Sequence, residues 1–175
     1  QADGTVIGWG SNGSGQIDIP SSATNVIAIA AGSFHSLALK ADGTVIGWGA
    51  GGPGMSGDLN FDQTVIPSSA TNVIAIAAGH YHSLALRADG SIVGWGAGRP
   101  GTSGFPHFTQ ATVPEDATRI LRIAAGGYHS VAVRQDGTLL AWGLNNEGQL
   151  DIPLNATNII DVAAGHGHNL AVQFH

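Results

Sequence analysis

The chain alternates every few residues between short apolar runs and glycine-rich turns. VIAIAA at 26–31 interleaves large side chains with alanine, and the runs HSLAL at 35–39 and VIGWG at 45–49 follow it. Runs of five or six residues bounded by Gly, Asp and Ser predict short strands. Asp42-Gly43 separates the second run from the third, and an Asp-Gly pair is a strong signal for a tight hairpin turn with positive φ. The pattern therefore predicts antiparallel strands and almost no helix.

The same runs recur four times. AAGSFHSLAL at 30–39 returns in varied form at 77–86, 124–133 and 163–172, and the tryptophans Trp9, Trp48, Trp95 and Trp142 are spaced by 39, 47 and 47 residues. These periods lie within or near the range of propeller blades and solenoid units. Large residues interleaved with alanine are typical of a strand covered on both faces by neighbouring sheets. We therefore expect residues 1–175 to form a single array of stacked sheets.

Two longer phrases carry a resemblance to a known family. WGSNGSGQIDIP at 9–20 and WGLNNEGQLDIP at 142–153, together with the AAGxxHSLAL phrase, resemble the regulator of chromosome condensation (RCC1-like) repeat. The resemblance covers nearly the whole chain. It implies an all-β fold, a β-propeller of four-stranded blades with four repeats in this chain, where the family usually has seven blades.

Within that family, the sequence is similar to bacterial secreted members such as the propeller-type β-lactamase inhibitor, which uses loops of this kind to grip its target. The name-giving member is a nucleotide-exchange factor for a small nuclear GTPase and docks on chromatin. This chain has no basic tail, so we do not expect that activity. The resemblance implies a protein partner.

The two ends of the chain complement each other. It begins with QADGTVIGWG, without the strand that precedes this phrase elsewhere, and finishes with HNLAVQFH, without the strand that follows. Three arrangements stay open: an eight-bladed ring from two chains, a fragment of a longer propeller, and a single-chain four-bladed ring. We favour the homodimer, because blades normally one seventh of a turn apart need only a small adjustment to reach one eighth.

Composition narrows the classes of function. Only 10% of the residues are charged and the net charge is −6, so no cationic surface is expected for nucleic acid. Cysteine is absent, which removes disulfides and thiolate chemistry, and no apolar run approaches the ~20 residues of a membrane span. We expect a secreted or cell-surface protein, and a cytoplasmic location is the alternative. A removed signal peptide and a longer parent chain are both compatible with a sequence that begins at Gln1.

The histidines common to all repeats are the obvious candidates for chemistry. His35, His82, His129 and His168 recur in every unit, which predicts an architectural role in which each ring bonds the backbone of a neighbouring blade near the axis. The serine after His35 cannot form a dyad with it, because adjacent strand residues face opposite sides. We expect no catalytic residue, metal or cofactor. The alternative is that the four imidazoles surround a channel and hold a metal.

The turns after AAG carry the candidate binding residues. Phe34, Tyr81 and Tyr128 share one position, so rotation about the axis would gather them on one rim as interface anchors, unless they only pack between blades. His80 and His166 join this face; each makes a His-x-His pair, with His82 and His168, which we expect to bind metal only adventitiously. Two loops, 49–67 and 96–114, are eight residues longer than their counterparts. Long loops on a repeat scaffold usually collect on one face, often the face that binds, and the alternative is that they are spacers.

These features together predict a non-enzymatic binding module that presents a loop-lined propeller face to a protein, with a glycan as a second class of partner. Two alternatives stay open. One is a metal-type or hydrolase-type site in the central channel. The other is a purely structural repeat segment of a larger surface protein.

Overall fold

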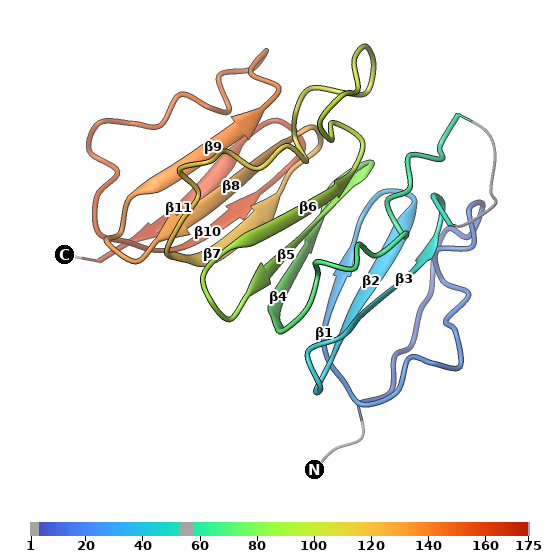
Figure 1. The fold of residues 1–175 in the computed structure, drawn as a ribbon. Coiled ribbons are helices and arrows are strands. Elements are labelled where there is room, and N and C mark those ends of the chain that lie inside the picture. Colours follow the sequence, from blue (N-terminus) through green and yellow to red (C-terminus); the bar gives the residue numbers. More distant parts are fainter. Residues whose placement is uncertain (1–3, 53–57, 175) are drawn as a thin grey trace.

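The computed structural model describes residues 4–52 and 58–174, which form a row of antiparallel β-sheets (Figure 1). The first three sheets each contain three strands in chain order, and the fourth contains two. The strands are β1 (Val26–Ala31), β2 (His35–Lys40), β3 (Val45–Gly49), β4 (Val73–Ala78), β5 (His82–Arg87), β6 (Ile92–Gly96), β7 (Ile120–Ala125), β8 (His129–Arg134), β9 (Leu139–Gly143), β10 (Ile159–Ala164) and β11 (Asn169–Gln173). The described residues contain no helix, hence none that could cross a membrane. The predicted all-β fold of stacked blades is confirmed.

Each complete sheet has three hydrogen-bonded strands, one fewer than the predicted four. After β3, the chain forms turns instead of a ladder: Val65 N donates to Asp62 O (3.0 Å), and Ala70 N donates to Pro67 O (2.9 Å). The positive φ of Asp62 (61°) and the proline interrupt an extended backbone. The segment still covers the sheet, because Ala70 is buried in the core. It therefore closes the blade by packing rather than by strand pairing.

The hairpin between β2 and β3 forms where the Asp-Gly pair predicts it, but its loop has three residues. Lys40 N donates to Thr44 O and Gly43 N donates to Lys40 O, both at 2.9 Å. Within this loop only Gly43 has a positive φ (80°), which identifies a type I turn followed by a left-handed glycine. The Asp42 carboxylate accepts from Thr44 N (3.0 Å) and fixes the turn. The same bond recurs in the second and third sheets.

Neighbouring sheets pack leucine against alanine and tryptophan. Leu37 and Leu39 of β2 are fully buried and lie in one cluster with Ala85 and Trp95 of the next sheet. The next interface repeats this arrangement with Leu84, Leu86, Ala132 and Trp142. Bulky side chains on one sheet thus meet small ones on the other, which is what close packing of twisted sheets requires. This explains why the strands interleave large residues with alanine.

The sheets form an open arc. First strands pack in the order β1, β4, β7 and β10, and Figure 1 places the β1–β3 sheet and the β10–β11 sheet at opposite sides of the array. On the last sheet Leu170 and Val172 are exposed, although their equivalents between sheets, Leu84 and Leu86, are buried. The single-chain four-bladed ring is therefore not formed. The two-chain ring stays a prediction.

Candidate functional site

Strand register brings the turns after AAG and the long loops to the same end of the array. His35 pairs with Gly49 and His82 pairs with Gly96, so the turn before each second strand lies beside the end of the third strand, where the loop begins. Figure 1 shows these loops along the upper edge of the sheets. The predicted binding residues all lie in these turns: Phe34, His80, Tyr81, Tyr128 and His166.

The repeated histidines link each sheet to the next one through side chains. His35 Nε2 lies 2.9 Å from Ser83 Oγ, and Ser83 Oγ donates to the backbone oxygen of Gln63 at 2.8 Å. The hydroxyl hydrogen is directed at that carbonyl, so the hydroxyl oxygen accepts from the ring and the proton of His35 sits on Nε2. The indole N–H of Trp95 donates to the same Gln63 oxygen (2.8 Å). We call this set of four groups the histidine relay.

The bond from each histidine to a side chain of the next sheet repeats along the array, with asparagine in place of serine at the last junction. His82 Nε2 lies 3.0 Å from Ser130 Oγ, and at the last junction His129 Nε2 lies 2.8 Å from Asn169 Oδ1. Asn169 Nδ2 donates to Gln149 O (2.7 Å), so the asparagine performs both functions of the serine. The predicted architectural role therefore fits the geometry. The predicted acceptor was wrong, because each ring bonds a side chain of the next sheet instead of its backbone.

Burial keeps the relay histidines neutral. It lowers the pKa of His35 to about 4 and that of His82 to about 3, and it also lowers the pKa of His129. The Nδ1 atoms of these three rings are buried with no hydrogen-bond partner among the described residues. A Cβ on Gly32 would stand 2.7 Å from His35 Nδ1, which explains the glycine of the AAG phrase. A serine whose hydroxyl is buried and committed to a carbonyl cannot act as a nucleophile.

Phe34, Tyr81 and Tyr128 form a continuous rim. The rings of Phe34 and Tyr81 stack with their centroids 5.3 Å apart and their planes 17° apart, and Tyr81 and Tyr128 follow at 6.0 Å. All three side chains are half-buried. Rotation from one sheet to the next thus gathers these aromatics at one end of the array. The rings contact one another across sheets and also keep an open face.

The long loops add aromatic residues that sequence reasoning missed. Phe61 contacts Tyr81 edge-on at 5.2 Å, and Phe108 contacts Tyr128 edge-on at 5.5 Å. Phe105 lies 5.7 Å from Tyr128 and is 73% exposed. A signal was present, because Phe61 and Phe108 each stand two residues before the glutamine of the repeat. We call the six rings, Phe34, Phe61, Tyr81, Phe105, Phe108 and Tyr128, the aromatic rim.

The glutamine of each repeat holds the adjoining loop in place. Gln63 is fully buried; its Oε1 accepts from Phe61 N (2.8 Å) and its Nε2 donates to Leu59 O (2.8 Å). Gln110 does the same, accepting from Phe108 N at 2.7 Å. One residue therefore fixes the position of a rim aromatic with its side chain and joins the relay with its backbone oxygen.

His80 and His166 pair with each other. His166 Nδ1 lies 3.2 Å from His80 Nε2, and the His80 ring centroid lies 5.1 Å from that of Tyr128. Burial, and then the positive charge that His166 would carry, lower the pKa of His80. The expected pairing of His80 with His82 does not form, because His82 is buried in the relay. No group of three or more potential metal ligands is found among the residues that the structure describes.

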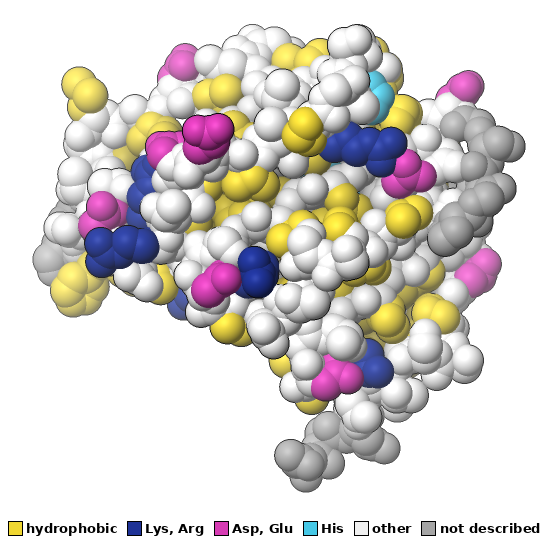
Figure 2. Space-filling view, in the orientation of Figure 1, with side chains coloured by type: hydrophobic (Ala, Val, Ile, Leu, Met, Phe, Trp, Pro, Cys, Tyr) yellow, Lys and Arg dark blue, Asp and Glu magenta, His cyan; other side chains and the backbone are white. Residues whose placement is uncertain are grey.

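Charged side chains are few and locally paired. Five of the six Lys and Arg side chains lie within 4.0 Å of a carboxylate, and the closest pairs are Arg99 with Asp62 and Arg134 with Asp116, each at 2.6 Å. Figure 2 shows the basic and acidic groups scattered over an otherwise uncharged face. Most of the positive charge therefore has a carboxylate nearby.

The repeat pattern and the fold identify the family. The Regulator of chromosome condensation (RCC1) repeat matches residues 26–52, 73–99 and 120–149. The chain belongs to the RCC1-repeat family. The comparison with curated proteins found no significant match.

Several solved structures, two of them of yeast RCC1 (Prp20), superpose on most of the array. Prp20p from Saccharomyces cerevisiae, in a study of its binding to Gsp1p and histones, has a TM-score of 0.69 at 24% identity over 95% of this chain and 51% of its own. Yeast RCC1 (Prp20) bound to Kap60 has a TM-score of 0.63 at 27% identity over 89% of this chain and 43% of its own. The ectodomain of the Arabidopsis thaliana receptor kinase ACR4 has a TM-score of 0.59 at 19% identity, over 85% of this chain and 46% of its own. The chain spans about half the length of these proteins.

A hollow adjoins the rim of this RCC1-repeat array. Its volume is about 390 Å³, and its lining includes Phe105, Phe108, Tyr128, Glu147 and His166. Four aromatic or imidazole side chains thus line this hollow together with polar residues, and Glu147 contributes a carboxylate. Such a hollow suits an apolar or aromatic side chain of a partner that also donates a hydrogen bond.

Proposed function

We propose that this RCC1-repeat chain is a non-enzymatic protein-binding module and that the aromatic rim is its docking surface. The observation that carries the proposal is the distribution of aromatic residues. The chain has five Phe and two Tyr, and six of these seven belong to the rim. Aromatic side chains gathered on an accessible face, outside the hydrophobic core, are typical interface anchors.

The chemistry of the rim indicates what it would bind. Its rings are neutral, Arg99 and Asp62 pair with each other, and Glu147 is the carboxylate in the hollow beside Tyr128. A partner would therefore dock through apolar and aromatic side chains with a few hydrogen bonds, and salt would affect affinity little. The fold supports a protein as partner, since Prp20p was studied with Gsp1p and histones and in complex with Kap60.

The experiment is partner capture from the natural environment of the protein, comparing wild type with the triple variant Phe34→Ala, Tyr81→Ala, Tyr128→Ala. We expect the triple variant to lose the captured protein while keeping a cooperative unfolding transition. Phe105→Ala is the milder test, because this exposed ring can be removed without disturbing the core. Ile74→Ala, an exposed apolar residue on β4 away from the rim, is the matched control.

Capture of the same protein by the wild type and the triple variant would refute the proposed surface. Unfolding of the triple variant together with undiminished capture by Phe105→Ala would show that the rings belong to the core. Binding of glycans, and no protein, in a rim-dependent manner would replace the proposed class of partner.

A further inference from the structure

Each complete junction between sheets is filled by a tryptophan from a third strand. Trp95 of β6 is 4% exposed and donates to Gln63 O, and Trp142 of β9 is 6% exposed and donates to Gln110 O (2.9 Å). The last sheet has only β10 and β11 among the described residues. There Gln149 O accepts from Asn169 Nδ2, and no indole of the described residues reaches it. The last junction therefore lacks its tryptophan.

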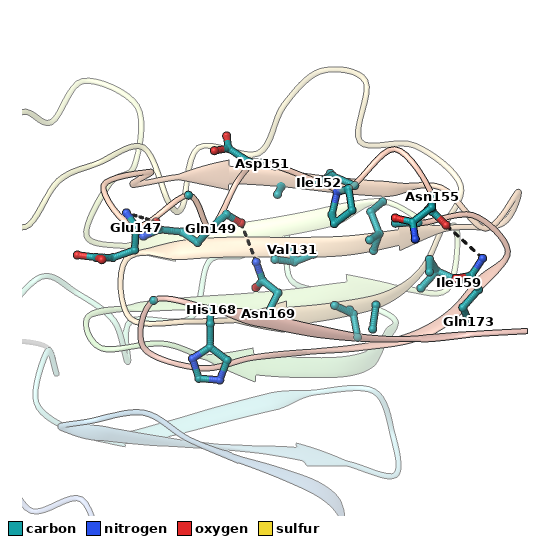
Figure 3. Close-up of a pocket in the computed structure, with 18 residues that line it drawn as sticks. Val131, Glu147, Gln149, Asp151, Ile152, Asn155, Ile159, His168, Asn169 and Gln173 are labelled. Atoms are coloured by element: carbon teal, nitrogen blue, oxygen red, sulfur yellow. Dashed lines mark hydrogen bonds between the residues drawn. The ribbon is translucent and has the colours of Figure 1, made fainter.

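A cavity of about 390 Å³ occupies the place of that tryptophan (Figure 3). Val131, Ile152 and Ile159 contribute apolar side chains to its lining. Gln149 and Asn169 also line the cavity and are joined by a hydrogen bond, as Figure 3 shows. The wall also includes Ala171, the counterpart of Ala85, which lies in one cluster with Trp95 at the first junction. The cavity is thus shaped and lined for the side chains of a third strand.

The opposite end of the array presents such a strand without a neighbour. Residues 5–9 have the sequence TVIGW, identical to 44–48, and Gly4 O accepts from Val26 N (3.2 Å) as Gly43 O accepts from Val73 N (3.2 Å). The segment therefore lies against β1 as a third strand would. Two of its large apolar side chains are exposed to solvent: Ile7 is 77% exposed and Trp9 is 81% exposed.

The histidine relay is divided between the two ends in the same way. Ser36 Oγ donates to Gln16 O (2.8 Å) and Trp48 donates to the same oxygen (2.9 Å), but no histidine of the described residues reaches Ser36. At the other end His168, the counterpart of His129, is exposed. A small apolar hollow of about 190 Å³ lies at Ser36, between Trp9 and β1.

We propose that a second copy of this chain completes both ends, so that residues 5–9 of each copy pair with β11 of the other. The register of β2 with β3, in which Ser36 pairs with Trp48 and Ala38 with Ile46, places Trp9 opposite Asn169 and Ile7 opposite Ala171. The Trp9 indole enters the cavity and donates to Gln149 O. His168 donates to Ser36 of the other copy, and Leu170 packs on its first sheet.

A second copy fits better than the chain's own other end. The open arc holds the two ends apart, so one chain cannot join them (Figure 1). Among the residues that the structure describes there is one such donor strand and one such acceptor cavity, so two copies related by a twofold axis can complete each other. Two such contacts close a ring of eight blades, a number known for propellers. The exposed apolar faces of both end sheets then become interior.

The first experiment measures mass in solution. Light scattering and native mass spectrometry of the wild type should give twice the 17.7 kDa of the chain. Trp9→Ala should weaken dimerisation about 30-fold at each of the two junctions, as for an interface hot spot, while leaving the fold of the single chain intact. Phe105→Ala on the aromatic rim should stay dimeric, which separates this inference from the proposed function. A wild type with the mass of one chain at every concentration would overturn it.

The second experiment tests the register with cysteines, which the natural chain lacks. The double variant Ile7→Cys, Ala171→Cys should form a covalent dimer under mild oxidation, because both side chains face the cavity. The matched control Gly8→Cys, Ala171→Cys places the two thiols on opposite faces of the sheet and should remain uncrosslinked. A covalent monomer, no disulfide, or equal yields in both variants would overturn the proposed pairing.

Discussion

Acid should destabilise the array because the buried relay histidines bind protons less readily in the folded state than in the unfolded state. The folded protein holds the pKa of His35 at about 4 and that of His82 at about 3, whereas an unfolded chain has the ordinary value of 6.5. Between these values the unfolded state binds more protons than the folded state, so stability falls as pH falls below 6.5. Above that range both states are neutral and stability does not depend on these rings.

The magnitude follows from the width of this window. Each buried histidine contributes up to ~1.4 kcal/mol per pH unit, so His35 and His82 together remove about 5 kcal/mol between pH 6.5 and 4.5. His129, whose pKa is also lowered by burial, acts in the same direction. Hydrogen bonds from Thr44 hold the pKa of Asp42 below its usual value, so this turn carboxylate titrates outside the window. Such a loss is comparable to the whole stability of a small domain.

Urea unfolding followed by tryptophan fluorescence at several pH values between 7 and 4.5 measures this slope. His82→Gln should lower stability at pH 7 and reduce the slope by about one proton, since it removes one buried imidazole. Ile74→Ala, which replaces an exposed apolar side chain, is the control and should leave the slope unchanged because it removes no titratable group. A stability independent of pH across this window, or a slope that His82→Gln does not alter, would refute the assignment of the relay rings as buried and neutral.

Two further substitutions test the relay, each followed by urea unfolding. Ser83→Ala removes the acceptor of His35 and should cost about 1–3 kcal/mol by leaving a buried N–H unpaired; a change near zero would mean that the bond contributes nothing. Gly79→Ala would place its Cβ far inside the van der Waals contact distance of the His82 ring, so we expect more than ~3 kcal/mol of destabilisation. Gly13→Ala, which meets no atom within 4 Å, should cost little, and equal effects at both glycines would contradict the steric argument.

The strands and their stacking were predictable because they follow from local pattern. Alternation of large residues with alanine predicted sheets covered on both faces, and the leucine-to-alanine packing of Leu37 on Ala85 is its physical basis. The number of strands per blade was not predictable in this way. The segment after β3 has the turn residues of a loop, and only its contact with the sheet makes it part of the blade.

The histidine relay could be predicted only in part. Period-two alternation correctly separates His35 from Ser36, yet it cannot show that the serine 48 residues away, Ser83, meets the His35 ring. That contact depends on the offset between neighbouring sheets, which no single repeat contains. The same reason explains why His80 was paired with His82 from the sequence, whereas in the structure it meets His166 from a sheet two positions away.

The repeat separates architecture from recognition within a few residues. At the start of β5, His82 is buried and joins two sheets, while the residue before it, Tyr81, belongs to the aromatic rim. Successive residues of an extended chain face opposite directions, so one can vary without disturbing the other. The glutamine ties the loops to the same frame, because its backbone oxygen serves the relay whatever the loop length. A longer loop can therefore add Phe61 or Phe108 to the rim at no cost to the junction beneath, which is how a repeat of fixed design could acquire a new partner.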